Sequence, residues 1–289
     1  MLSWAILNGL VLGAIYILIA LSLVLIYGVL EIPDFSQAGL YAMSAYLTLS
    51  GMNYLGLNYL VALPLSIVLI IGLGLLSERF AYRPLQNKAP GSILIVALGL
   101  LFILDNSALV IWGHEHKSIS IPLLAGKTLS LGNTTFSYER GLAIIVALFL
   151  VLMVHFILMH TKRGDAIRAI IQNREAAVLM GIKINSVRSS TFALSCVLTA
   201  IAGSLIGSIL SLHPNMGDYI IIKGFGAIIL GGMGNVLGAA LGAIIMGFAE
   251  SFGDTYFSSA YKDFFAFVII ILVLLFRPSG LLGKKERVG

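Results

Sequence analysis

Apolar runs long enough to cross a membrane recur along the chain, separated by short polar segments. A spanning helix needs about 20 predominantly apolar residues. Runs near that length cover Ala5–Leu30, Ala38–Tyr59, Leu60–Leu76, Ile93–Trp112, Leu142–Met159, Ser190–Leu212 and Phe264–Phe276, and a glycine-rich apolar stretch covers Ile220–Phe252. The pattern predicts an all-α polytopic membrane protein with about eight or nine transmembrane helices, some of them broken or re-entrant.

The composition supports a membrane protein over a soluble one. Hydrophobic residues make up 59% of the chain and charged residues 11%, against about 25% charged in soluble globular proteins. We therefore expect residues 1–289 to form a single transmembrane domain in contact with membrane lipid. The single cysteine, Cys196, excludes a disulfide framework or a cysteine-built metal site within one chain.

Lysine and arginine positions predict how the chain is oriented, because cytoplasmic loops carry an excess of these residues. Three segments, Ser77–Pro90, His160–Ser190 and the tail from Arg277, hold 13 of the 18 basic residues but only 4 of the 13 acidic ones. We expect these segments in the cytoplasm, with the N-terminus and the loop Gly113–Arg140 outside. The net charge of +5 is then an orientation signal, and no nucleic-acid partner is expected.

An even number of crossings must separate the basic loop at 160–190 from the cytoplasmic tail. The stretch Ile220–Phe252 is therefore predicted to be two short helices that turn on the inner side. Transporters often place substrate contacts at such breaks, because irregular backbone at membrane depth requires protein or a water-filled cavity around it. The turn residues Gly231, Gly232, Gly234 and Asn235 are thus candidates for the substrate pathway.

A second break is predicted after the first span. Pro33 lacks an N–H and restricts the residue before it, so the first helix should end there. The segment Glu31–Gln37 is either an ordinary surface turn or a second border of the substrate pathway. In the second case the pathway residues are Asp34, Phe35, Ser36 and Gln37.

Three acidic residues within or at the ends of the apolar runs raise the question of burial. Asp105, in the fourth run, either faces the bundle interior, as ionisable residues within spans normally do, or lies beyond an early helix end at the outer interface. The interior position makes it a pathway candidate. Glu250 and Asp254, at the end of the glycine-rich stretch, are expected at the membrane interface.

The remaining motifs argue against an enzyme. Gly126-Lys127-Thr128 ends like a phosphate-binding loop, but Ile121 stands where the first glycine is required. His114 and His116 lack carboxylate partners at ligand spacing, so no metal site and no catalytic residues are expected. Glycines at four-residue intervals are interpreted as helix-packing faces; they are Gly203, Gly207, Gly234, Gly238 and Gly242.

The basic loop at 160–190 carries its own helix signals. Ile167, Ile170 and Ile171 form an apolar stripe. Asn173 can then cap a second short helix with Glu175 in its first turn, and Gly181 is placed to end it. An alanine-rich face between basic residues favours a docking surface over a merely solvated loop.

At this loop the sequence resembles a known family. Glu175-Ala176-Ala177 followed by Gly181 is similar to the EAA…G signature of ABC-importer permeases. The wider run from Gly164 to Ile182 resembles the branched-chain amino acid permeases of the LivH type. The resemblance extends over essentially the whole chain. The further similar segments are Asn8–Leu10, Gly13–Tyr16, Ala20-Leu21, Ile26–Leu30, Leu230–Ala239 and Arg277–Gly283.

The resemblance implies the ABC-importer permease fold and a prokaryotic plasma (inner) membrane location. The chain would translocate branched-chain or other hydrophobic amino acids delivered by an extracytoplasmic binding protein. It would pair with a second homologous permease and with two ATPase subunits, which would use ATP and Mg while this chain binds no cofactor. The loop would couple to the ATPase through Arg163, Gly164, Arg168, Asn173, Arg174, Glu175, Ala176, Ala177 and Gly181.

One departure leaves the cargo open. The family usually has Asn-Phe-Ala-His-Gly after the first span, where this chain has Asp34-Phe35-Ser36-Gln37-Ala38. A permease for urea, amides or another small solute is therefore an alternative within the same superfamily. An alternative of another class is a stand-alone secondary transporter that is coupled to an ion gradient through Asp105.

Overall fold

The computed structural model describes residues 1–30, 33–86, 88–121, 124, 126–131, 134–257 and 262–283. Within them the helices are α1 (Leu2–Leu30), α2 (Ser36–Leu55), α3 (Tyr59–Ser77), α4 (Pro90–Trp112), α5 (Tyr138–His160), α6 (Lys162–Gln172), α7 (Arg174–Leu179), α8 (Ile184–Ile209), α9 (Met216–Gly231), α10 (Val236–Tyr256) and α11 (Lys262–Phe276). A π-helix η1 (Glu78–Tyr82) and a 3-10 helix η2 (Arg83–Leu85) extend α3. Strands β1 (Thr128–Leu131) and β2 (Thr134–Ser137) pair antiparallel before α5.

Six of these helices are long and apolar enough to cross a membrane, namely α1, α3 with its extension, α4, α5, α8 and α10. The bundle also contains the more polar α2 and the shorter α9 and α11. The described chain thus has nine bundle helices, in addition to the short α6 and α7. The predicted helical membrane fold is confirmed. The β1–β2 hairpin lies within a loop for which no structure was predicted.

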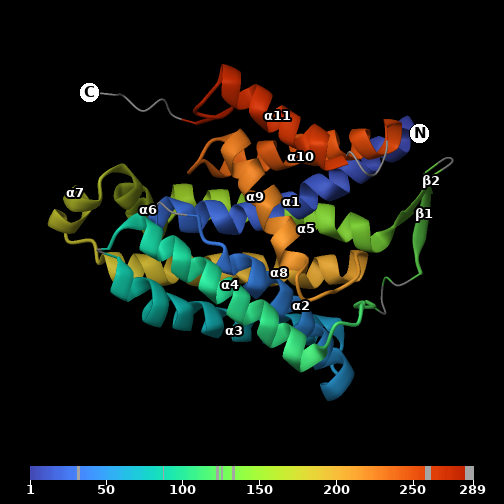
Figure 1. Cartoon of the computed structure of the whole chain (residues 1–289), viewed down its shortest axis with the longest axis horizontal. Coiled ribbons are helices and arrows are strands. Elements are labelled where there is room, and N and C mark those ends of the chain that lie inside the picture. Colours follow the sequence, from blue (N-terminus) through green and yellow to red (C-terminus); the bar gives the residue numbers. More distant parts are fainter. Residues whose placement is uncertain are drawn as a thin grey trace.

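The bundle has two distinct ends (Figure 1). The N-terminus and the β1–β2 hairpin lie at one of them, called the hairpin end below, and α6 and α7 lie at the other, the α7 end. Because α3, α4, α5 and α8 run lengthwise between these ends, the connections between them alternate from one end to the other.

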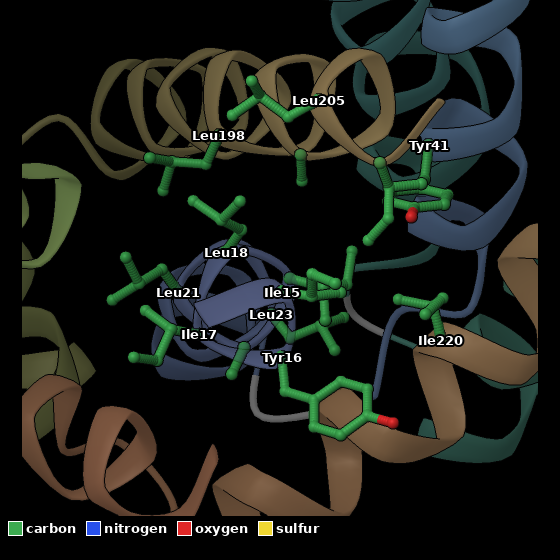
Figure 2. Close-up of a cluster of buried hydrophobic side chains, with 14 of the residues drawn as sticks. Ile15, Tyr16, Ile17, Leu18, Leu21, Leu23, Tyr41, Leu198, Leu205 and Ile220 are labelled. Atoms are coloured by element: carbon green, nitrogen blue, oxygen red, sulfur yellow. The ribbon is translucent and has the colours of Figure 1, made fainter. Parts of the chain in front are cut away.

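Helix α1 forms the centre of the bundle. In its most apolar window 89% of the residues are buried, against 22% in α3, as expected for a helix that is apolar all round and enclosed by its neighbours. Figure 2 shows Leu18 of α1 beneath Leu198 of α8, and Tyr16 on the side toward α9. The lipid-facing surface therefore belongs to outer helices such as α3, α4 and α5.

The glycine-rich stretch forms two helices, as predicted. Helix α9 ends at Gly231 and α10 begins at Val236, with Gly232 at φ 106° and Gly234 at φ 83° between them. A positive φ of this kind favours glycine. The Asn235 side chain accepts a hydrogen bond from the Gly238 amide at 3.0 Å and caps α10.

The packing role predicted for the glycines is correct at three of five positions. A Cβ added at Gly238, Gly242 or Gly203 would come within 2.4 Å of a backbone oxygen on a neighbouring helix, so the absence of a side chain allows these helices to approach closely. The prediction is wrong for Gly234, which is a turn residue in open space, and for Gly207, which faces Ile119 and Leu212 in connecting loops.

The start of α8 also differs from the prediction. The helix begins at Ile184 rather than Ser190, so the last residues of the basic loop belong to the span. Polar residues hide this start in the sequence, and the buried Arg188 lies 3.9 Å from the Glu78 carboxylate of η1. Glu31, Ile32 and the basic residues Lys284, Lys285 and Arg287 lie outside the described residues.

Candidate functional sites

Helix α6 turns the chain sharply away from the end of α5. Thr161 caps α6 by accepting a hydrogen bond from the Gly164 amide at 3.1 Å, and its hydroxyl donates to the Ile157 carbonyl at 2.6 Å. A Cβ at Gly164 would lie 2.3 Å from the same carbonyl oxygen. The predicted coupling residue Gly164 thus permits the tight α5–α6 corner. Ile167 and Ile170 are buried, as the stripe predicts, whereas Ile171 is exposed.

Helix α7 has the boundaries that its sequence signals predict. The Asn173 side chain accepts a hydrogen bond from the Ala176 amide at 2.9 Å. Glu175 lies in the first turn, near the positive end of the helix dipole. Gly181 follows the helix at φ 83°, the left-handed conformation of a helix C-cap.

The exposed face of α7 is more apolar than the predicted alanine-rich face. Ala177 is buried, whereas Leu179 and Met180 are 87% and 84% exposed and Val178 is exposed beside them. Arg163, Arg174 and Glu175 are also exposed, while Arg168 pairs with Asp165 at 2.6 Å. A large apolar surface next to charged residues is typical of a protein-binding site.

The segment from Asp34 to Gln37 is buried and starts α2. The Asp34 carboxylate accepts hydrogen bonds from the Ser36 backbone amide at 3.0 Å, from the Ser36 hydroxyl at 2.7 Å and from the Gln37 side-chain amide at 3.3 Å. The Tyr82 hydroxyl of η1 also donates to it. Asp34 is only 2% exposed, so the surface-turn alternative is wrong.

This buried network continues into α8 and α9. Gln37 accepts hydrogen bonds from the Thr199 hydroxyl at 2.6 Å and from the Ser195 hydroxyl at 3.3 Å. The ring of Phe35 contacts that of Phe225 on α9, with centroids 5.1 Å apart. The segment therefore ties α2, η1, α8 and α9 together, and several hydrogen-bond donors are directed at the buried Asp34 carboxyl group.

Asp105 lies in the interior of the bundle. Helix α4 continues for two turns beyond it to Trp112, and the side chain is 4% exposed, which rules out an early helix end. Its Oδ1 has no hydrogen-bond partner in the described chain. The charged group that acts on it is Asp218, in the first turn of α9. Asp218 was not among the predicted residues.

The turn at 231–235 lies against the C-terminal segment. The Leu281 and Leu282 amides donate to the Leu230 and Gly231 carbonyls, each at 2.9 Å. The Asn235 amide group donates to the Leu282 carbonyl at 3.0 Å. The three groups of predicted pathway residues therefore occupy three separate contact environments: the Asp34 network, the Asp105–Asp218 contact and this turn.

A further buried ion pair was missed by sequence reasoning. Lys223 of α9 lies 3.0 Å from the Glu250 carboxylate of α10, and the Tyr16 and Tyr219 hydroxyls donate to the same carboxylate. Both charged side chains are almost fully buried, so the expected interfacial position of Glu250 is wrong. A charge within an apolar helix is the sequence signal that could have found Lys223.

Comparisons with known proteins agree with the resemblance seen in the sequence. A family profile described as "Branched-chain amino acid transport system / permease component" matches residues 5–274. The high-affinity branched-chain amino acid transport system permease protein BraD of Pseudomonas aeruginosa is 33% identical, over 96% of this chain and 95% of the relative. The corresponding protein LivH of Escherichia coli is 30% identical, over 96% and 94%.

A solved structure supports the fold independently of sequence. PsaBC from Streptococcus pneumoniae, determined in complex with Fab, aligns with a TM-score of 0.50 at 13% identity, over 99% of this chain and 93% of that one. At this identity the likeness shows the fold alone.

Proposed function

Because this chain belongs to the branched-chain amino acid transport permease family, we propose that it is the membrane permease subunit of an ABC importer for branched-chain or other hydrophobic amino acids. The observation that carries the proposal is the match of nearly the entire chain to such permeases. Family members are transport subunits, in agreement with the prediction that this chain is not an enzyme.

The importer complex supplies the other activities. Permeases of this family work with ATPase and binding-protein partners. We propose one second, homologous permease, two ATPase subunits that bind ATP and Mg, and an extracytoplasmic binding protein that delivers the substrate. The chain is a multi-pass membrane protein, and we place it in a prokaryotic plasma membrane with its N-terminus outside and its C-terminus in the cytoplasm.

We assign coupling to the loop at 160–190. The exposed side chains of Val178, Leu179 and Met180 form a surface that suits an apolar cleft on an ATPase, and the exposed Arg163 and Arg174 suit acidic groups at its edge. Gly164, Asn173 and Gly181 support this surface by fixing the ends of α6 and α7. A movement of the ATPase subunits would thereby reach α5 and α8, which flank the loop.

The breaks in the bundle are the proposed border of the translocation path. Asp34 and Gln37 hold the start of α2 against α8 and η1. The turn at 231–235 connects α9 to α10 and is held by the C-terminal segment. These contacts suit residues that support moving helices, and Asp105 is a buried residue whose Oδ1 has no hydrogen-bond partner among the described residues.

Substrate uptake by the reconstituted importer tests this function. The chain is purified with its permease, ATPase and binding-protein partners and placed in liposomes, and uptake of labelled leucine, isoleucine and valine is measured with and without ATP. We expect ATP-dependent uptake of at least one of them, and none by the lone chain. Uptake of urea or acetamide instead would support the small-solute alternative, and ion-driven uptake by the lone chain would support a secondary transporter.

A further inference from the structure

Two carboxylates from different helices meet near the hairpin end of the bundle. The Asp105 side chain of α4 is 4% exposed, and the Asp218 carboxyl group of α9 lies close enough to interact with it electrostatically and to share a hydrogen bond with it when one of the two is protonated. The Oδ1 atoms of both residues are buried and have no hydrogen-bond partner in the described chain. Each therefore has an acceptor site available for a donor that the described chain does not supply.

Packing on one turn of α2 brings the two residues together. A Cβ added at Gly39 would lie 2.6 Å from the Leu104 side chain of α4, and one added at Gly217 would lie 2.1 Å from the Ala38 carbonyl oxygen. Helices α4 and α9 thus both touch α2 at Ala38–Gly39. Asp105 and Asp218 are the next residues along their helices, so their meeting follows from the backbone packing.

The described residues offer no cation to this pair. The ion pairs found there join other residues: Arg83 and Arg188 to Glu78, Arg168 to Asp165, and Lys223 to Glu250. The neighbouring His213 stacks edge-on with His116, with ring centroids 5.7 Å apart. Burial and the nearby His116 lower the pKa of His213, while Asp218 acts in the opposite direction, so the net effect disfavours the cationic form of its imidazole.

Two like-charged groups held together in an apolar bundle without a cation are costly. Asp218 gains some stabilisation from the positive end of the α9 dipole. Asp105 has no such help, because it lies in the interior of α4, far from the N-terminus of that helix. A bound cation would relieve this repulsion, and a cost of this kind within a span is typical of a functional site.

The pair is buried on the Asp105 side and partly exposed on the Asp218 side. Asp105 lies two turns below Trp112, or about 10 Å along α4. Asp218 is partly exposed, and its neighbours Asn215 and Tyr219 are exposed. The described chain contains no group of three or more histidine, cysteine or acidic residues placed to hold a metal ion. The two carboxyl groups offer acceptor oxygens to a hydrogen-bonding cation, and an ammonium group offers three donors.

We propose that Asp105 and Asp218 together bind the α-ammonium group of the transported amino acid at the entrance to the translocation path. The proposal rests on the function proposed above and names the residues that recognise one part of the substrate. The ammonium group donates charge-assisted hydrogen bonds to the two open carboxylate oxygens. The substrate side chain is then free to differ among amino acids, while its amino group is held at one place.

A matched pair of leucine analogues tests the site directly. The purified complex of this chain with its permease and ATPase partners is placed in lipid nanodiscs without the binding protein, and binding of labelled 3-methylbutylamine, which keeps the ammonium group, is measured. Binding of labelled 4-methylpentanoate, which keeps only the carboxylate, is measured alongside. The variants are Asp105→Asn and Asp218→Asn, and Glu115→Gln is the control because it removes an exposed carboxylate elsewhere.

We expect the amine to bind the wild type and the Glu115→Gln control equally and to lose at least tenfold in affinity in each aspartate variant. The carboxylate analogue should bind much more weakly than the amine. Unchanged amine binding in both aspartate variants would overturn the proposal. That result is expected if Asp105 and Asp218 only share a proton with each other and do not contact the amine. If amine binding depends on the two aspartates but the wild type takes up no leucine, the ammonium site is supported and the proposed substrate is refuted.

Discussion

The ion pair between Lys223 and Glu250 shows what a single side chain contributes inside this bundle. Its two charges are 3.0 Å apart and come from α9 and α10. The Lys223 ammonium also lies 5.1 Å from the ring centre of Tyr219 and 5.6 Å from that of Phe267 on α11. A buried ion pair contributes little net stability, but removing one partner leaves the other charge poorly compensated.

A double-mutant cycle at this pair gives the first prediction. Lys223→Met should lower the free energy of unfolding by about 3 kcal/mol or more, because the Glu250 carboxylate loses the ammonium at its side. The double variant Lys223→Met/Glu250→Gln should recover a large part of that loss. Thermal unfolding of the purified chain in detergent measures both. The single variant Glu250→Gln completes the cycle, and a double variant destabilised by the sum of the two single variants would show that the two side chains do not interact.

Single side chains are also where sequence reasoning is weakest. Asp105 could be identified because one acidic residue interrupts a long apolar run. Its partner Asp218 could not, because their meeting depends on how α4 and α9 pack on α2. Glu250 was placed at the interface because the apolar run ends near it, whereas α10 continues to Tyr256 and carries Glu250 into the core.

At the scale of elements, α7 depends on one backbone conformation at its end. Gly181 has φ 83°, and a Cβ there would meet nothing within 4 Å. A larger side chain would therefore fit sterically and be disfavoured only by the left-handed backbone. Gly72 of α3 is a matched position, because it also has open space around it but no positive φ.

This pair of glycines gives the second prediction. Gly181→Leu should abolish uptake and substrate-stimulated ATP hydrolysis by the reconstituted importer, because the α7 surface is displaced, while the chain still inserts into the membrane. Gly72→Leu, the same substitution without the backbone strain, should retain both activities. ATP hydrolysis and uptake are measured on the same liposomes. Normal uptake by Gly181→Leu would contradict the coupling role of the loop.

Elements fixed by local signals were predicted well. The caps at Asn173 and Gly181 lie where the sequence places them, because a cap requires only side chains within a few residues. The start of α8 was missed because its polar first turns are stabilised by distant contacts, such as that between Arg188 and Glu78. The π-helix η1 has no comparable local signal, whereas the Gly132-Asn133 dipeptide between two short runs is a hairpin signal that our prediction missed.

For the whole molecule, hydropathy predicted the class and most spans, and crossing parity predicted the α9–α10 turn. The central position of α1 could not be read from the sequence, since several runs are equally apolar. The structure brings two basic segments together at the α7 end, where Arg83 donates to the Ser189 hydroxyl at 3.0 Å. This proximity is consistent with the proposal that both face the cytoplasm.

The orientation of the whole chain gives the third prediction, through cysteine labelling. Met233 in the α9–α10 turn is exposed and makes no side-chain hydrogen bond, so Met233→Cys changes little else. Glu115, which is exposed in the loop after α4, provides a labelling position on the opposite side of the membrane. The natural Cys196 is buried and should give little background.

In sealed right-side-out vesicles, a membrane-impermeant maleimide should label Glu115→Cys and should leave Met233→Cys unlabelled until the membrane is permeabilised. The physical reason is that the basic segments keep the α7 end in the cytoplasm, while the chain crosses the membrane an odd number of times between its N-terminus and its tail. Labelling of Met233→Cys in intact vesicles would show that the chain has the opposite orientation. It would also place α7 outside, where no ATPase could reach it, and so contradict the coupling mechanism together with the topology.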